Sequence, residues 1–136
     1  MKKNWFLFSA VVFFLLTSCS AEKKLTKRLV GEWNVAKYSE QFHATGASEV
    51  TLTNIGKLHL NKDGTGDKLI NFSIMSRTVS DTLDFTWRNT EDKVTLISND
   101  ESLFAKTWLV MSNKKNEQVW SSTDDEGNSQ KMELKR

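Results

Sequence analysis

The chain has 136 residues, with one cysteine, no proline and a formal net charge of +2. Lys2 and Lys3 account for this excess, and the rest of the chain has 17 basic residues interspersed with 17 acidic ones. The balanced charge argues against a nucleic-acid partner, and a single cysteine excludes an intrachain disulfide.

The amino-terminal segment has the three parts of a secretory signal. Lys2 and Lys3 precede residues 5–16, which are apolar apart from Ser9. A membrane-spanning helix needs about 20 residues, so this run suits the apolar core of a signal better than a span. We predict a signal peptide over residues 1–18.

The lone cysteine ends the sequence "LTSC", which resembles the lipobox of bacterial lipoproteins. That family implies lipidation of Cys19, cleavage before it and acylation of the new amine. One acyl chain anchors a protein only marginally, at roughly 0.8 kcal/mol per buried CH₂, whereas several chains anchor it stably. An uncleaved anchor or a free thiol are the alternatives.

The lipobox resemblance also implies a cellular location and domain boundaries. Ser20 follows the cysteine where inner-membrane retention often favours Asp, so we expect a lipid anchor in the outer membrane of a bacterium. Periplasmic and surface orientations both remain open. We expect residues 19–27 to form a lipidated tether and residues 28–136 to form one domain.

The start of this domain changes from helical to strand periodicity. Leu25 and Leu29 are four residues apart, which places both on one side of a short helical turn that ends at Gly31. Apolar and polar residues then alternate over residues 57–61 and 82–88, as in strands with one buried face.

Further segments are dense in β-branched and aromatic residues and are separated by turn residues. Asp63-Gly64 is the strongest hairpin signal. The remaining predicted strands cover residues 32–38, 49–53, 68–75, 93–98, 103–111, 118–122 and 131–135.

The order of these strands predicts an all-β fold. No segment between them is long enough for a crossover helix, so neighbours should pair as antiparallel hairpins. Closure removes both exposed edges of such a sheet. We predict an up-and-down antiparallel β-barrel of about eight strands after a short helical turn. A sandwich is the main alternative, with residues 39–48 as its one candidate long connection.

The sequence "RLVGEWNV" (residues 28–35) resembles the opening of lipocalins and their bacterial relatives. Residues 55–67, 85–97 and 107–120 are similar in order to small lipocalin-like lipoproteins of the Bacteroidetes type. The resemblance implies that Trp33 plugs one end of the barrel and that Gly31 permits the tight entry to the first strand. It also implies a basic residue stacked on this tryptophan, supplied by Lys135 or Arg136.

An eight-stranded barrel is either filled by its own side chains or holds one small ligand. The same inward residues serve both interpretations, as plain core or as the wall of a site for an apolar or ring-bearing ligand. These residues are Leu58, Leu60, Phe72, Phe85, Trp87 and Trp108.

Catalysis has little support in the sequence. His43 and His59 do not have metal-ligand spacing, and we expect both at the surface. Residues 59–70 superficially resemble a calcium loop, but their first and twelfth positions are His59 and Ile70, not carboxylates. No nucleophile-elbow context is present. We expect no catalytic residue, no metal and no cofactor.

We therefore favour two non-enzymatic hypotheses. The first is a membrane-anchored lipocalin-like lipoprotein that binds a small apolar or amphiphilic ligand. The second is a surface or periplasmic module that binds a protein or polysaccharide through the outside of a solid barrel. In the second, Trp120, as a half-exposed platform, and residues 39–48 would make the contacts.

Overall fold

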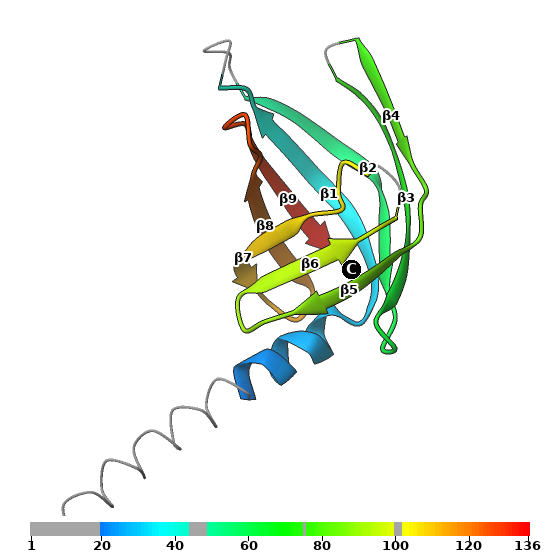
Figure 1. Ribbon diagram of the computed structural model, residues 1–136, viewed down its shortest axis with the longest axis vertical. Helices are drawn as coiled ribbons and strands as arrows, with labels where there is room; N and C mark the ends of the chain where they lie inside the picture. The colour runs from blue at the N-terminus through cyan, green and yellow to red at the C-terminus, as the bar shows by residue number, and fades with distance from the viewer. Residues whose placement is uncertain (1–19, 44–48, 75, 100–101) are drawn as a thin grey trace, which may run out of the picture.

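In the part of the chain that the computed structural model describes, nine antiparallel strands follow one helix over residues 20–29 (Figure 1). The structure describes residues 20–43, 49–74, 76–99 and 102–136, so Cys19 lies outside the described residues. The strands are β1 (Gly31–Gln41), β2 (Val50–Leu60), β3 (Thr65–Ile74), β4 (Arg77–Asp81), β5 (Phe85–Asn89), β6 (Lys93–Ile97), β7 (Thr107–Asn113), β8 (Glu117–Thr123) and β9 (Ser129–Lys135).

Eight of the strands close into a barrel in the order β2-β1-β9-β8-β7-β6-β5-β3, and pairing of β2 with β3 completes the ring. All pairings are antiparallel. β4 forms a hairpin with the outer half of β3 and lies outside the ring. The predicted closed up-and-down barrel is confirmed, and the sandwich is not.

Several strand predictions differ from the structure, and the strand predicted from residue 82 begins at Phe85. The strands predicted over residues 49–53 and 57–61 are one strand, β2, which is irregular at Asn54 (φ 52°). Gly56 (φ 152°) is required next to it, because a Cβ there would overlap the carbonyl oxygen of Leu69 on β3. β4 was not predicted, and residues 103–106 are not part of β7.

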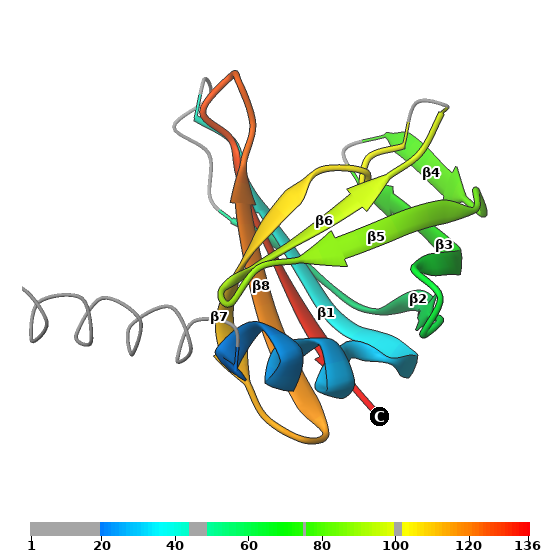
Figure 2. The same ribbon diagram turned by 60° about the horizontal axis from the view of Figure 1, so that its bottom comes forward.

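The amino-terminal helix covers one end of the barrel (Figure 2). Leu25 and Leu29 are buried in the core, as their spacing predicts. Residues 20–27, expected as a tether, are instead helical, because the same two leucines dock this segment under the strands. Arg28 Nη1 adds a 2.6 Å hydrogen bond to the carbonyl oxygen of Asn113.

The hydrophobic core is one cluster, and its buried members all lie between Leu25 and Leu134. The helix and barrel therefore form a self-contained unit. Within the described ranges, no helix is long and apolar enough to cross a membrane.

Candidate functional site

All six predicted interior residues are buried, but they lie in two groups. Leu58 and Leu60 pair with Trp33 and Gly31 near the helix. Phe85 and Trp87 are in the same half, since Phe85 pairs with Gly66 and Trp87 Nε1 donates to the carbonyl oxygen of Asn61 at 3.0 Å. Phe72 and Trp108 instead contact a central aromatic ring that the sequence analysis did not identify.

Trp33 closes the end of the barrel next to the helix. Its Nε1 donates to the carbonyl oxygen of Leu29 at 2.8 Å, and the Arg136 guanidinium carbon lies 3.9 Å from its ring centroid. Arg136 also donates to the carbonyl oxygens of Arg28 and Val30. Of the two basic residues considered for this stacking, the structure places Arg136 on the tryptophan.

Phe104 is the central ring, and it is fully buried although it lies outside the strands. Its centroid is 5.5 Å from that of Tyr38, 6.4 Å from that of Phe72 and 6.2 Å from that of Trp108. Three strands thus supply the aromatic wall around a ring from the β6–β7 connection. A signal for this arrangement is Lys106, which occupies an inward position of the predicted strand over residues 103–111.

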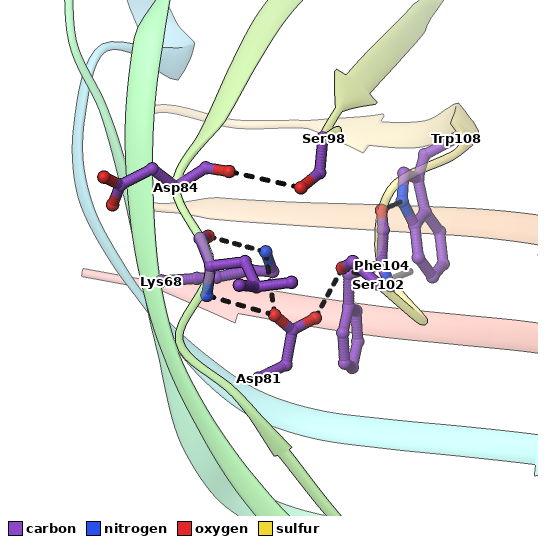
Figure 3. Close-up of polar contacts among 8 residues, drawn as sticks. Lys68, Asp81, Asp84, Ser98, Ser102, Phe104 and Trp108 are labelled. Carbon is purple, nitrogen blue, oxygen red and sulfur yellow. Dashed lines mark hydrogen bonds and ion pairs between the residues drawn. The ribbon is translucent and has the colours of Figure 1, made fainter. Parts of the chain in front are cut away.

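Residues 102–106, here called the plug segment, are held to the barrel by polar contacts (Figure 3). Ser102 Oγ donates to Asp81 Oδ2, and Trp108 Nε1 donates to the carbonyl oxygen of Phe104 at 3.1 Å. The Leu96 amide donates to the carbonyl oxygen of Lys106 at 3.0 Å. Side-chain contacts therefore do much of what a strand ladder does elsewhere.

Asp81 also belongs to a buried ion pair next to the plug segment. Lys68 Nζ lies 2.9 Å from Asp81 Oδ1 and donates to the carbonyl oxygen of Leu83 at 2.7 Å (Figure 3). The ammonium is also 5.4 Å from the Phe85 ring centroid. Each charge has partners, as burial requires, so this pair is a structural cross-link between β3 and the end of β4, and Leu83 extends it to the β4–β5 connection.

The carboxyl end of β1, the β8–β9 turn and the start of β9 lie at the end of the barrel away from the helix (Figure 1), and a distal polar cluster is built on them. One half is built on Glu40, which is buried and accepts a hydrogen bond from the Tyr38 hydroxyl at 3.2 Å. Arg77 Nη2 lies 3.5 Å from the same carboxylate oxygen. Burial, together with the Glu40 charge, raises the pKa of Tyr38 well above its ordinary value.

Lys106 begins the other half of the cluster. Its ammonium donates to Gln130 Oε1 at 3.1 Å and lies 5.5 Å from the Trp108 ring centroid. Gln130 Nε2 donates onward to Asp124 Oδ2 at 3.3 Å. Burial lowers the pKa of Lys106, against the opposing effect of Asp124 and Glu40. We define the cluster as Glu40, Arg77, Lys106, Asp124 and Gln130.

A groove of about 430 Å³ lies on the outer wall where β3 and β5 separate, outside the aromatic interior. Most of its side chains are hydroxyls, amides or carboxylates. The lining residues are Asn61, Thr65, Gly66, Asp67, Asp84, Phe85, Thr86, Ile97, Ser98 and Asn99.

Other surface predictions have mixed outcomes. His43 and His59 are exposed, as expected, and His59 Nδ1 lies 3.3 Å from Asp67 Oδ1. Trp120 was wrongly considered a half-exposed platform: it is fully buried, because it faces inward on β8 and packs on Trp108 with centroids 6.5 Å apart. Of the candidate contact loop 39–48, residues 44–48 lie outside the described residues.

The likeness to known proteins is one of structure. No family model and no curated protein matches the sequence. A lipocalin-like protein from Bacteroides uniformis is similar with a TM-score of 0.51 and 13% identity, over 80% of this chain and 98% of that one. A redesigned β-barrel has a TM-score of 0.44 and 16% identity, over 82% and 94%. The fold of this chain is a lipocalin-like β-barrel.

Proposed function

We propose that this protein is a membrane-anchored, lipocalin-like binding protein for a small apolar or amphiphilic ligand, held at the outer membrane by lipid on Cys19. One observation carries the ligand-binding part: Phe104, the central buried ring, comes from the plug segment and not from a strand. A strand residue leaves the interior only if the barrel ladder breaks. Phe104 can leave the interior once the few hydrogen bonds that hold the plug segment are broken.

A ligand ring or chain in the place of Phe104 would meet Tyr38, Phe72 and Trp108. These aromatic side chains suit an apolar partner, and such pairs contribute roughly 0.5–1.5 kcal/mol each beyond area burial. Phe72 and Trp108 are therefore the predicted interior residues that we assign to the ligand. Leu58, Leu60, Phe85 and Trp87, which lie toward the helix, would remain core.

The distal polar cluster would hold the polar part of an amphiphile. Lys106 donates to a neutral amide oxygen and has desolvated surroundings, so an acceptor group on the ligand would gain a charge-assisted hydrogen bond. Arg77 is half exposed at the same end. Apolar walls with a few convergent polar groups are the usual composition of a small-molecule site.

The ligand part is tested with the Cys19→Ser chain lacking residues 1–18, by native mass spectrometry and by displacement of dansyl-undecanoic acid. We expect the probe to bind, and Phe104→Leu to bind it more tightly because the smaller side chain is displaced more easily. Phe85→Leu is the matched control, since it makes the same change in the helix half of the core. A probe that does not bind wild type or Phe104→Leu contradicts the proposal.

The anchor is tested separately by labelled-palmitate incorporation into the full chain in a bacterial host. We expect label in wild type and none in Cys19→Ser. If wild-type protein incorporates no label, the proposed anchor is wrong, whereas the proposed ligand site is unaffected.

The outer-wall groove favours a second candidate, polysaccharide binding through the outside of the barrel. Its volume is in the range of small-molecule sites, and Asp67 and Asp84 offer carboxylates among hydroxyl and amide groups. Titration with soluble oligosaccharides, followed by NMR, should shift groove resonances and not those around Phe104. Asp84→Ala should abolish these shifts, whereas Asp92→Ala, on the exposed β5–β6 turn, should preserve them.

A further inference from the structure

The amino-terminal helix has a basic side opposite the side that it buries. Lys23, Lys24 and Lys27 are exposed, whereas Leu25 and Leu29 are buried. At 3.6 residues per turn, the lysines fall within an arc of about 100° whose centre is roughly opposite the two leucines. Docking of the helix on the barrel therefore directs all three lysines away from it.

The β7–β8 turn extends this surface. Arg28 Nη1 donates to the carbonyl oxygen of Asn113, and the Arg136 amide donates to that of Asn116 at 3.2 Å, so the turn lies beside the helix (Figure 2). The exposed lysines of the turn complete a surface that we call the basic face: Lys23, Lys24, Lys27, Lys114 and Lys115.

The basic face is not neutralised by ion pairs within the described part of the chain. The ion pairs of that part involve Lys37, Lys57, His59, Lys68, Arg77 and Lys131, none of which belongs to the face. The acidic side chains on the helix and the turns beside it are Glu22, Glu91, Asp92 and Glu117.

The turn at the opposite end of the barrel is acidic. The β8–β9 turn, at the end away from the helix, carries Asp124, Asp125 and Glu126 in succession. An anionic surface would attract the basic face and repel this turn.

We propose that the basic face lies against an anionic bilayer and turns the distal polar cluster away from it. The bilayer is the occupant because of where the chain continues: residue 20, the first residue that the structure describes, is already helical and directly follows the residue to which we assign the lipid. This placement rests on the proposed anchor. It holds the lysines near the surface, within about the 8 Å Debye length at physiological salt, where each adds roughly five-fold to binding.

The orientation has a consequence for the ligand. The plug segment and the distal polar cluster open toward water and not into the anchoring bilayer. A ligand would therefore be taken from, and returned to, the aqueous phase beyond the membrane.

The experiment supplies the anchor chemically, so that its failure is distinct from failure of natural lipidation. The chain from residue 19 has a single thiol, Cys19, and contains every residue of the core within the described ranges. It is coupled to maleimide-headgroup lipid in vesicles of phosphatidylcholine alone or mixed with phosphatidylglycerol. Mass spectrometry then measures the acetylation rate of each lysine.

On anionic vesicles we expect the five lysines of the basic face to react more slowly by about three-fold or more, while Lys131 reacts as before. High salt should remove the difference. The K23Q/K24Q/K27Q variant should lose the protection of Lys114 and Lys115. The K57Q/K62Q/K131Q variant, with the same change of net charge, should keep it. Equal rates on neutral and anionic vesicles, or equal protection of Lys131, would overturn the proposal.

Discussion

The two ends of the barrel interior are closed in different ways. At the helix end, Trp33 is a strand residue held by the carbonyl oxygen of Leu29 and covered by Arg136. At the other end, Phe104 belongs to a connection and is held by side-chain contacts such as Ser102 to Asp81. The first closure is part of the strand ladder, whereas the second is the one that the proposed ligand binding requires to withdraw while the fold remains.

The strand pairing has the same asymmetry. β1 and β2 pair from Gly31–Leu60 to Glu40–Val50, whereas the described register of β3 and β5 contains Thr65–Thr86 and Gly66–Phe85. The buried Lys68–Asp81 pair fills the gap beyond these two positions. Free energies of local opening follow such differences in ladder and packing, so opening should begin on the side of the plug segment.

The largest effect should come from Trp33→Ala at the permanent closure. The variant loses a fully buried indole and its hydrogen bond, and strands on both sides prevent the site from collapsing. We expect a loss of about 3–5 kcal/mol in the free energy of unfolding. Urea unfolding measures it. A loss smaller than that of Phe104→Ala would contradict the comparison.

Phe104→Ala should be less destabilising, with a loss of about 3 kcal/mol, because the plug segment is able to relax inward. It should also create a dry apolar cavity lined by Tyr38, Phe72 and Trp108, and such cavities bind benzene. Thermal unfolding with and without benzene measures both effects. Phe85→Ala is the control, and an equal response to benzene in both variants would argue against a special site at Phe104.

These two residues also mark how far the sequence predicts the molecule. Trp33 is recognisable because Gly-x-Trp is a local pattern, whereas the sequence leaves both Lys135 and Arg136 open as the basic residue that stacks on it. Leu25 and Leu29 likewise predict the helical turn, since both face the core four residues apart. Strict alternation predicts the strands over residues 57–61 and 82–88, and the density of β-branched and aromatic residues predicts most of the others.

Phe104 is different, because residues 103–111 are rich enough in apolar and aromatic residues to suggest one strand, and Lys106 at an inward position is the one local sign against it. Only tertiary contacts show that Phe104 lies on a turn while Trp108 lies on β7. Trp120 was misjudged because the serines after it suggested exposure, although the inward face of β8 continues through it. A side chain that reaches the core from a connection between strands produces no periodic pattern in the sequence.

Alkaline pH should distinguish the distal end from the rest of the core. Tyr38 is the only tyrosine, and its folded pKa is raised above the unfolded value of about 10. Its contribution is therefore fully present below about pH 10 and is lost as the pH rises above it, by up to roughly 1.4 kcal/mol per pH unit. Phenolate absorbance should appear together with unfolding and not before it. In Tyr38→Phe this part of the pH dependence should vanish.

A smaller loss should follow Arg136→Gln at the helix end. The guanidinium is partly exposed over Trp33, and cation–π contacts of this kind contribute roughly 1 kcal/mol. Urea unfolding should show that loss. Displacement of dansyl-undecanoic acid should be unchanged, because the helix end does not open. Weakened probe binding in this variant would contradict the division into two ends.

Lys106→Met should have the smallest effect on stability, and in the opposite direction. Burial lowers the folded pKa of Lys106, so the charged form opposes folding at neutral pH, and this cost is relieved as the pH rises through that pKa. Methionine retains packing on Trp108 without the charge but leaves Gln130 Oε1 without its donor. We expect a net gain of at most about 0.5 kcal/mol, measured by thermal unfolding. Affinity for dansyl-undecanoic acid, which carries a carboxylate, should fall in the same variant. If Lys106→Met keeps its stability but binds the probe more weakly, Lys106 serves the ligand. If the affinity for the probe is unchanged, Lys106 has a structural role alone.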